Sequence, residues 1–559
     1  MKTISFFFSA LFFLHIAVAQ ECYPVDKTQI PTIQQDVEFL ADDALTGRYP
    51  GTFGALRAKN YIAERFMSFG LQPKGTSGFD QMFTVPEPVK IAGEGNFVTI
   101  KGEALKQNEQ YYPTQYSANG KVDGKTIWVK YGITAPELNY DDLKSVKNLE
   151  GKIAVMDVSS PDGIHPHSEY AKYHDLGGRI DNLKKMGAIG VMLVNLGDMA
   201  EDVRTGYKKI RSTEVPVVFV SDDAYAKKIK KSVEVSFGVN QMEQTAEAFN
   251  VVGFLDNKRP TTVVIGAHYD HLGYGGSGTG SLYTGEPAIH NGADDNASGT
   301  AALIAMAEYL SKSTDLKGHN YLFIAFTAEE MGLLGSNYFA NNPTYPIEQM
   351  CYMVNMDMVG RLREGKLQIS GTGTAEQWDG VFAKLGCDNF DFKLDESGVG
   401  PSDHTSFYNV DLPVLHFFTG THEDYHKPAD DADKINYQGI AEVISVIKTV
   451  MTRVDNEEKL EFRETKNQDA RKAPRFSVTL GIMPDYMYED GGVRIDGVTE
   501  GKPAAEAGLQ KGDIITKLGD FNIVDMYAYM NALAAFKKGD KATIVFLREG
   551  NEMEGKVQF

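Results

Sequence analysis

Short apolar runs alternate with helical patterns of apolar residues through the middle of the chain. Residues 263–267, 321–326 and 351–355 are runs of the buried-strand type, whereas residues 299–310 and 437–450 repeat apolar side chains at helical spacing. This alternation predicts an α/β fold, in which a mixed and mostly parallel sheet is covered by helices on both faces. Polar motifs follow the ends of these strands, which is the edge where open α/β sheets bind their ligands.

The same patterns predict how the rest of the chain is divided. Apolar residues spaced by three and four predict helix from residue 37 to residue 69, and Gly70 and Pro73 end it. We assign residues 20–110 and 244–455 to one large domain, with a β-rich insert at 111–243. Residues 456–473 are dense in charge and read as a linker. Short strands, glycine-rich turns and a helix at 526–535 predict a small separate module at 474–559.

The first residues have the pattern of a signal peptide. Lys2 precedes an apolar run at 6–18, and Ala17-Val18-Ala19 gives a small-x-small cleavage site after residue 19. The run is too short for a spanning helix, and no other stretch reaches that length. We therefore expect an exported protein, periplasmic or extracellular, without a membrane span.

The net charge narrows the range of expected partners, whereas the cysteine content leaves the pairing of the thiols undecided. The chain has 559 residues and a net charge of −20, which disfavours nucleic acid and anionic lipid as partners. Cys22, Cys351 and Cys387 do not form a disulfide framework. A Cys351–Cys387 disulfide and buried free thiols are both consistent with the sequence.

Acidic and histidine motifs follow one another in a fixed order. They are Gly-Ala-His268-Tyr-Asp270-His271, Gly292-Ala-Asp294-Asp295-Asn296-Ala-Ser-Gly299, Ala-Glu329-Glu330, Asn-Met-Asp357 and Tyr425-His426. Each motif alone is common in surface loops, but their occurrence in order after apolar strands indicates a site.

These residue types suit a pair of divalent metals. Zinc takes histidine nitrogen and carboxylate oxygen, and two zinc ions can share a carboxylate and a water. His268, Asp295, Glu330, Asp357 and His426 supply that inventory. Asp295 is the expected bridge, since it lies in a glycine-flanked turn where the backbone can approach the ions. The chemistry favoured is hydrolysis by two Zn²⁺ ions.

Two further residues, Glu329 and Asp270, support the predicted ligands. Glu329 and Glu330 are adjacent and point in different directions, so Glu330 can bind metal while Glu329 takes a proton from water. Asp270, two residues after His268, can accept the other ring N–H of a ligand histidine and fix its tautomer.

With these motifs in place, residues from about 37 to 454 resemble the co-catalytic zinc aminopeptidases related to aminopeptidase S and aminopeptidase Y, and more distantly the glutamate carboxypeptidases. The resemblance implies that His268 and Asp357 hold one zinc, that Glu330 and His426 hold the other, and that Asp295 bridges them. No ligand position is substituted.

The resemblance also implies a mechanism. A metal-bridging hydroxide attacks the scissile carbonyl, Glu329 is the general base, and Tyr425 stabilises the oxyanion. The implied function is an aminopeptidase acting on peptides. A carboxypeptidase or dipeptidase on the same scaffold, and a peptide-binding protein with a structural metal site, are the alternatives. Cyclisation of N-terminal glutamine on a single zinc fits poorly with an intact second ligand pair.

The two other segments resemble accessory modules. The insert resembles a protease-associated domain, on Gly-Lys-Ile-Ala-Val, Gly-Ala-Ile-Gly-Val-Met and Val-Pro-Val-Val. The last segment resembles a PDZ domain of the bacterial protease type, on Leu480-Gly481-Ile482 and the Pro503 to Ile515 stretch. The resemblance implies a groove that captures a peptide C-terminus by strand addition. The alternative is that the module only packs against the large domain.

Several signals are weaker. The glycine-rich segment 273–285 lacks the residues of a phosphate loop, and we interpret it as a mobile loop near the metal entrance. His290, Asp403 and His404 are candidates for substrate contact or for support of the ligands. The histidines at 165, 167 and 174 have no metal-site spacing and indicate a solvated loop.

Overall fold

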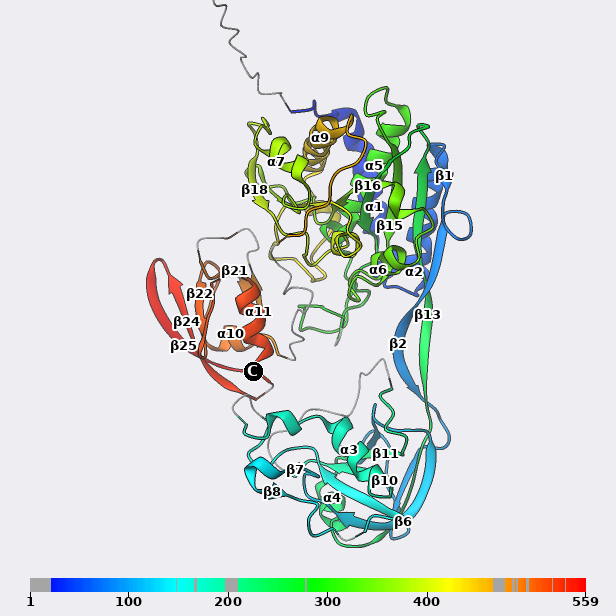
Figure 1. Cartoon of the computed structure of the whole chain (residues 1–559), viewed down its shortest axis with the longest axis vertical. Coiled ribbons are helices and arrows are strands. Elements are labelled where there is room, and N and C mark those ends of the chain that lie inside the picture. Colours follow the sequence, from blue (N-terminus) through cyan, green and yellow to red (C-terminus); the bar gives the residue numbers. More distant parts are fainter. Residues whose placement is uncertain are drawn as a thin grey trace, which may run out of the picture.

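Three large sheets and one two-stranded sheet organise the described part of the chain (Figure 1). The computed structural model describes residues 22–146, 148–164, 168–196, 210–276, 279–465, 478–484, 488, 491–498, 502–524, 526–537 and 539–559. The predicted signal peptide and the histidines at 165 and 167 lie outside the described residues. In the part that is described, no helix is both long and apolar enough to cross a bilayer.

The largest sheet contains nine strands among the described residues, and it confirms the predicted α/β fold. Its order is β1 (Gln72–Pro73), β13 (Gln241–Leu255), β15 (Asn320–Phe326), β14 (Thr262–His268), β16 (Met350–Met356), β19 (Val414–Phe418), β17 (Lys366–Ser370) and β18 (Asp391–Asp395), with β2 (Asp80–Ile91) also paired to β13. The four central strands β15, β14, β16 and β19 run parallel. Every residue in these four strands is buried, as their continuous apolar runs require.

Helices cover both faces of this sheet. One face packs against α1 (Ile30–Leu40), α2 (Phe53–Ser68), α5 (Gly299–Lys312), α7 (Glu376–Phe382) and α9 (Tyr437–Val454). The other packs against α6 (Leu334–Asn341) and α8 (His404–Tyr408). Short helices join these elements: η1 (Lys27–Gln29), η2 (Asp43–Arg48), η5 (Ala293–Ser298), η6 (Ile347–Gln349) and η7 (Ala432–Lys434).

The strands of the second sheet lie between residues 97 and 239. Its order is β4 (Glu103–Ala104), β3 (Phe97–Ile100), β12 (Glu234–Val239), β6 (Gly120–Trp128), β9 (Lys152–Asp157), β10 (Ala188–Val194), β11 (Val217–Val220) and β5 (Tyr111–Pro113). It carries α3 (Leu176–Lys185), α4 (Asp223–Ile229), η3 (Pro136–Leu138), η4 (Ala171–Tyr173) and the hairpin of β7 (Thr134–Ala135) and β8 (Tyr140–Asp141). Because β3 pairs with β12, the insert begins at Phe97, ahead of the predicted boundary at residue 111.

A long two-stranded ribbon connects the insert to the large sheet. Strands β2 and β13 pair antiparallel from Gln241 opposite Ile91 to Val251 opposite Asp80. Figure 1 shows this ribbon running down one side of the molecule, with the insert at its far end. The sequence analysis did not predict the full length of either strand.

The third sheet is the predicted C-terminal module. Its order is β20 (Ile482–Pro484), β21 (Val493–Val498), β22 (Ile514–Leu518), β24 (Lys541–Arg548) and β25 (Asn551–Gln558), with β23 (Phe521–Asn522) paired to β22. Helices α10 (Pro503–Glu506) and α11 (Met526–Ala534) pack with it around a separate apolar core. In the described residues β20 is an edge strand, and Thr421 of the large domain donates a hydrogen bond to its Pro484 carbonyl at 3.1 Å.

The structure corrects the continuous helix predicted at 37–69. Helix α1 ends at Leu40 and α2 begins at Phe53, and a turn with left-handed residues at Thr46, Gly47 and Arg48 separates them. Leu45 and Arg48 in this turn are buried, so apolar spacing continues through a segment that is not α-helical.

The predicted linker at 456–473 is also partly wrong. Leu460 is buried in the large domain's core, and Arg463 forms an ion pair with Asp379 at 2.8 Å. Thr465 donates its backbone N–H to the Tyr408 hydroxyl at 2.9 Å. Residues 456–465 therefore belong to the large domain, and the remainder lies outside the described residues.

The cysteines pair differently from the combination that the sequence analysis considered. Cys22 and Cys387 form a disulfide, whereas Cys351 is a buried free thiol. Cys351 lies within β16, whose residues are all buried in the sheet. The disulfide instead ties the segment ahead of α1 to the loop after α7.

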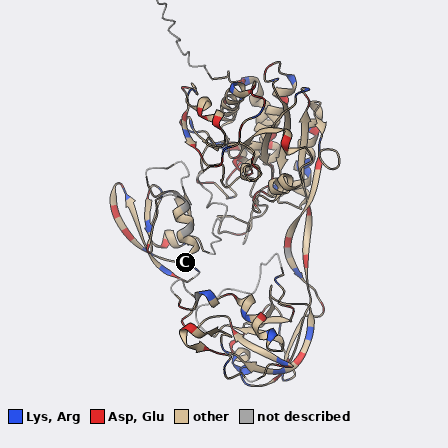
Figure 2. Cartoon of the chain, in the orientation of Figure 1, with Lys and Arg blue, Asp and Glu red and all other residues tan. Residues whose placement is uncertain are grey.

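Charged residues are interspersed over all three units (Figure 2).

Candidate metal centre

The predicted ligands lie at one edge of the large sheet, where parallel strands end. His268 is the last residue of β14, and Asp357 follows directly after β16. Glu329 and Glu330 follow β15, which is the other neighbour of β14. The carboxyl ends of three adjacent parallel strands thus bring these side chains together.

Asp295 lies between two groups of donor atoms. Its Oδ1 is 3.5 Å from His268 Nε2, and its Oδ2 is 3.1 Å from His426 Nε2. His268 Nε2 is also 3.3 Å from Asp357 Oδ1, and His426 Nε2 is 3.2 Å from Glu330 Oε2. All five predicted ligands therefore come together, with Asp295 in the position expected of a bridge.

The turn that carries Asp295 is held by side chains on both sides. Asp430 Oδ2 accepts the backbone N–H groups of Asp294 at 2.9 Å and Asp295 at 3.1 Å. Asn296 donates to the Met356 carbonyl at 3.0 Å and accepts the Met358 N–H at 3.1 Å. The Asn296 contacts join this turn to the segment bearing Asp357.

Gly292 starts this turn in a left-handed conformation, with φ 55°. A Cβ at this position would lie 2.1 Å from the Asp295 carbonyl oxygen and 2.5 Å from the His271 ring. We expect Gly292→Ala to displace Asp295 and to reduce bound zinc and activity by about tenfold or more. Metal content of the purified variant measures this.

The control for that substitution is Gly276→Ala, in the neighbouring loop. Gly276 also has a left-handed φ, 103°, but a Cβ there meets nothing within 4 Å. It should keep the metal content of the wild type. Equal losses in both variants would show that backbone strain, and not the contact with Asp295, is responsible.

His426 is oriented by the glycine-rich segment that was predicted to be a mobile loop. Its Nδ1–H donates to the Gly280 carbonyl at 2.9 Å, and its own carbonyl accepts the Leu282 N–H at 3.0 Å. The first bond leaves Nε2 facing Asp295 and Glu330. The Tyr425 ring stacks on the His426 ring with centroids 3.8 Å apart. The role of Tyr425 toward an oxyanion stays a prediction.

His271 is a member of the site that sequence reasoning missed. Its Nδ1–H donates to Glu330 Oε1 at 2.7 Å, and its ring is buried. His271, Asp295 and Glu330 form a group with mutually close donor atoms, and His268, Glu329 and Asp357 form another. The signal was present in the sequence, since His271 ends the His-Tyr-Asp-His motif.

Asp270 contacts the adjacent glutamates in addition to its predicted partner. Its Oδ1 is 3.6 Å from His268 Nδ1, which is beyond hydrogen-bond distance, so its role in fixing the histidine tautomer stays a prediction. Its carboxylate also accepts the backbone N–H of Glu329 at 3.1 Å and of Glu330 at 3.4 Å. Asp270 therefore joins the strand end at His268 to the Glu-Glu turn.

The two adjacent glutamates have opposite electrostatic surroundings. Burial, reinforced by the charges of Asp357 and Glu330, raises the pKa of Glu329 well above its ordinary value although His268 opposes this. Burial acts in the same direction on Glu330, but His426 and His271 outweigh it and hold the pKa of Glu330 well below its ordinary value. Of the two carboxylates, Glu329 therefore has the higher proton affinity and Glu330 the lower.

Side chains behind the site include the weaker candidates. Burial raises the pKa of Asp403 to about 7, and its carboxylate is fully buried. The His404 ring stacks on His416 with centroids 4.5 Å apart. His290 accepts a hydrogen bond from the Ser281 hydroxyl at 2.8 Å. None of these residues belongs to the two donor groups found among the described residues.

Ser402, which the sequence analysis did not single out, contacts the predicted ligand Asp357. Its hydroxyl donates to Asp357 Oδ2 at 2.7 Å and accepts from the Asn355 amide at 2.8 Å. It therefore fixes the Asp357 oxygen that faces away from His268.

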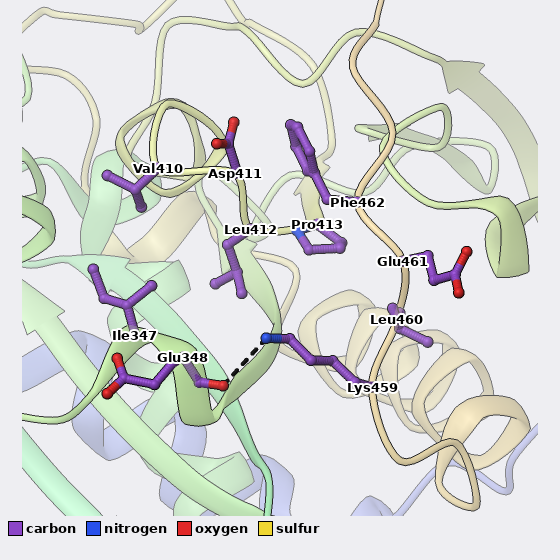
Figure 3. Close-up of a pocket in the computed structure, with 10 residues that line it drawn as sticks. All are labelled: Ile347, Glu348, Val410, Asp411, Leu412, Pro413, Lys459, Leu460, Glu461 and Phe462. Carbon is purple, nitrogen blue, oxygen red and sulfur yellow. Dashed lines mark hydrogen bonds between the residues drawn. The ribbon is translucent and has the colours of Figure 1, made fainter.

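A hollow of about 760 Å³ elsewhere on the large domain is unrelated to these residues (Figure 3). Its walls include Leu412 and Pro413, just ahead of β19, and Ile347 and Glu348, just ahead of β16. It thus lies by the amino ends of two strands whose carboxyl ends face the metal-ligand candidates.

The donor set fits divalent cations. Asp295, Glu329, Glu330 and Asp357 are all largely buried, with side-chain exposures of 5%, 11%, 7% and 14%. Buried carboxylates this close repel one another unless cations compensate them. The mixture of histidine nitrogen and carboxylate oxygen is the ligand chemistry that zinc uses in catalytic sites.

Two parts of the chain match models of known protein families. A family model described as peptidase family M28 matches residues 250–451, and a PDZ domain model matches residues 462–558. Leupeptin-inactivating enzyme 1 of Streptomyces exfoliatus is 30% identical over 192 residues, which are 34% of this chain and 39% of that protein. Aminopeptidase YwaD of Bacillus subtilis is 24% identical over 278 residues, 47% of this chain and 56% of that protein. The chain therefore spans only part of these relatives.

Among solved structures, an aminopeptidase from Aneurinibacillus sp. strain AM-1 is 22% identical, with a TM-score of 0.43 over 78% of this chain and 95% of that one.

Proposed function

We propose that this chain, whose residues 250–451 form a peptidase family M28 domain, is an exported aminopeptidase that uses two zinc ions to release N-terminal residues from peptides. The observation that carries the proposal is the placement of Asp295, whose two oxygens face His268 on one side and His426 on the other. Relatives named as aminopeptidases support the reaction class.

The residues divide into two sets that would hold the ions. His268 and Asp357 would hold one zinc, Glu330 and His426 the other, and Asp295 both. Zinc bound there would polarise the scissile carbonyl and lower the pKa of water. His271 contacts Glu330 and keeps one of its oxygens occupied.

Glu329 is the proposed general base. Its carboxylate lies 3.9 Å from His268 Nε2, beside the donor groups. Glu329 accepts a proton from the attacking water and then passes it to the leaving amine as the C–N bond breaks. Tyr425 donates a hydrogen bond to the oxyanion of the tetrahedral intermediate.

An acidic site favours the amino end of a peptide. Asp270 and Asp295 are buried in the site, and the negative potential of these carboxylates attracts the α-ammonium group of a substrate. A C-terminal carboxylate would be repelled by the same groups. The aminopeptidase is therefore favoured over a carboxypeptidase on the same scaffold.

Blocked peptides test this choice. We expect N-terminal acetylation to lower kcat/KM by about 100-fold or more, because the blocked amine loses its attraction to the buried carboxylates. C-terminal amidation of the same peptide should change kcat/KM by less than about threefold. A large fall in kcat/KM on C-terminal amidation but not on N-terminal acetylation would establish a carboxypeptidase. A large fall on both modifications would establish a dipeptidase.

Export and peptide capture are further parts of the proposal. The Cys22–Cys387 disulfide and the predicted signal peptide support an oxidising, extracytoplasmic location. The match of residues 462–558 to a PDZ domain and the edge position of β20 support capture of a peptide C-terminus there. We retain the protease-associated assignment of the insert as part of this proposal.

A further inference from the structure

We propose that Arg48 is a positioning residue for the metal centre, which holds the loops carrying His268 and Asp295 at a fixed separation and thereby sets the zinc affinity of the site. The inference rests on the proposed function. Arg48 lies in the turn between α1 and α2, outside residues 250–451, and it touches none of the predicted ligand side chains through its hydrogen bonds.

The guanidinium of Arg48 joins the two ligand loops through their backbones. Its Nε donates to the Tyr269 carbonyl at 2.6 Å, and Tyr269 lies between His268 and Asp270. Its Nη1 donates to the Asn291 carbonyl at 2.6 Å, and its Nη2 to the Gly292 carbonyl at 3.0 Å. One rigid, planar group therefore fixes the distance between the end of β14 and the turn that bears Asp295.

The same guanidinium also reaches α1. Its Nη1 donates to the Leu40 carbonyl, so the helix end, the strand end and the turn meet on one side chain. Arg48 is fully buried. A buried arginine that donates only to backbone carbonyls carries a charge that needs compensation from farther away.

That compensation comes from the acidic cluster around the metal ligands. Burial lowers the pKa of Arg48 to about 10, and the charges of Asp270, Asp295 and Asp430 oppose the lowering. The side chain thus remains a cation at neutral pH. Near closely spaced carboxylates, a fixed cation reduces their mutual repulsion in the metal-free protein, so the effect of Arg48 on zinc affinity comes from its hydrogen bonds to the two ligand loops.

The backbone conformation of the turn directs the Arg48 side chain into the protein interior. Thr46, Gly47 and Arg48 have φ values of 48°, 69° and 48°, a left-handed run that is costly for the two residues with a Cβ. A Cβ on Gly47 would lie 2.5 Å from the His290 carbonyl and 2.6 Å from the Gly273 carbonyl. Gly273 also donates its N–H to the Gly47 carbonyl at 3.1 Å. The turn therefore packs closely against Gly273 and His290, which follow the motif that contains His268.

A zinc titration of metal-free protein against a chromogenic chelator tests the inference. Arg48→Met keeps much of the volume but removes every donor, and we expect its zinc affinity to fall at least about tenfold, with a parallel fall in kcat. Arg48→Lys keeps the charge but cannot reach both loops, so its zinc affinity should lie between those of wild type and Arg48→Met.

Arg179→Met is the matched control. Arg179 is also a buried arginine, 4% exposed, and it donates to the backbone carbonyls of Tyr131, Val158 and Ser159 in the insert. Its replacement should destabilise the fold but leave zinc affinity within about twofold of wild type. An equal fall in both arginine variants would overturn the inference, because global destabilisation would then explain it.

The remaining outcomes are also decisive. Wild-type zinc binding together with an Arg48→Met affinity within twofold of wild type would overturn the positioning role and leave the proposed function standing. If Arg48→Met does not fold by circular dichroism, an unchanged zinc affinity of Arg48→Lys would overturn it. A wild-type protein that binds no zinc would refute the proposed function itself.

Discussion

Replacing Glu329 by glutamine is expected to lower kcat by about 10²–10⁴-fold while leaving the bound zinc unchanged. Glutamine has the shape of glutamate but cannot accept the proton of water. The surroundings that raise the pKa of Glu329, burial first and then nearby carboxylates, select it over Glu330 for this task. Hydrolysis of an aminoacyl para-nitroanilide, with metal analysis of the same sample, measures both quantities.

Two control variants sharpen this result. Glu330→Gln removes a predicted ligand that contacts His271 and His426, so it should lose zinc as well as turnover. Glu423→Gln alters an exposed residue close to the site in sequence and should behave as wild type. Near-normal turnover of Glu329→Gln would remove Glu329 as the general base.

Exhaustive chelation should abolish hydrolysis and lower thermal stability. The buried carboxylates at Asp295, Glu330 and Asp357 repel one another without cations, so both activity and folding depend on the metal. At a free zinc concentration about 100 times its dissociation constant, binding stabilises the folded state by about 2.7 kcal/mol. The measurements are residual activity and the thermal midpoint, before and after dialysis against a chelator.

Adding metals back identifies the ion. Zinc should restore both activity and thermal midpoint, whereas magnesium should not, because histidine nitrogen is a poor ligand for magnesium. Hydrolysis that survives complete removal of metal would contradict the metal mechanism altogether.

Much of the central fold was predictable because the strands of a buried parallel sheet are apolar on both faces. The predicted runs at 263–267, 321–326 and 351–355 fall within β14, β15 and β16. The predicted helices at 299–310 and 437–450 fall within α5 and α9. Local sequence identified these elements, because continuous apolar runs indicated the strands and helical spacing of apolar residues indicated the helices.

Elements that depend on distant partners were missed or misplaced. Apolar and polar side chains alternate only weakly along β2 and β13. These two strands pair with each other in a ribbon away from the main core, so neither has a face that is buried along its whole length. The turn at Thr46 to Arg48 interrupts an apolar spacing that reads as continuous helix. The Cys22–Cys387 pairing joins residues separated by 365 positions, and sequence spacing carries no information about it.

The sequence by itself determined the residue types of the site and the strands that carry them: His268, Asp295, Glu330, Asp357 and His426 are recognisable because each follows an apolar strand or a glycine-rich turn. The tertiary structure alone decided which atoms face one another. In the folded chain His271 hydrogen-bonds to Glu330, and His426 hydrogen-bonds to the Gly280 carbonyl. Arg48 hydrogen-bonds to the backbone of both ligand loops. The physical reason is that ligand identity is a local property of the chain. Hydrogen bonds to backbone carbonyls and the surroundings of buried charges instead depend on the packing of segments that are far apart in the sequence.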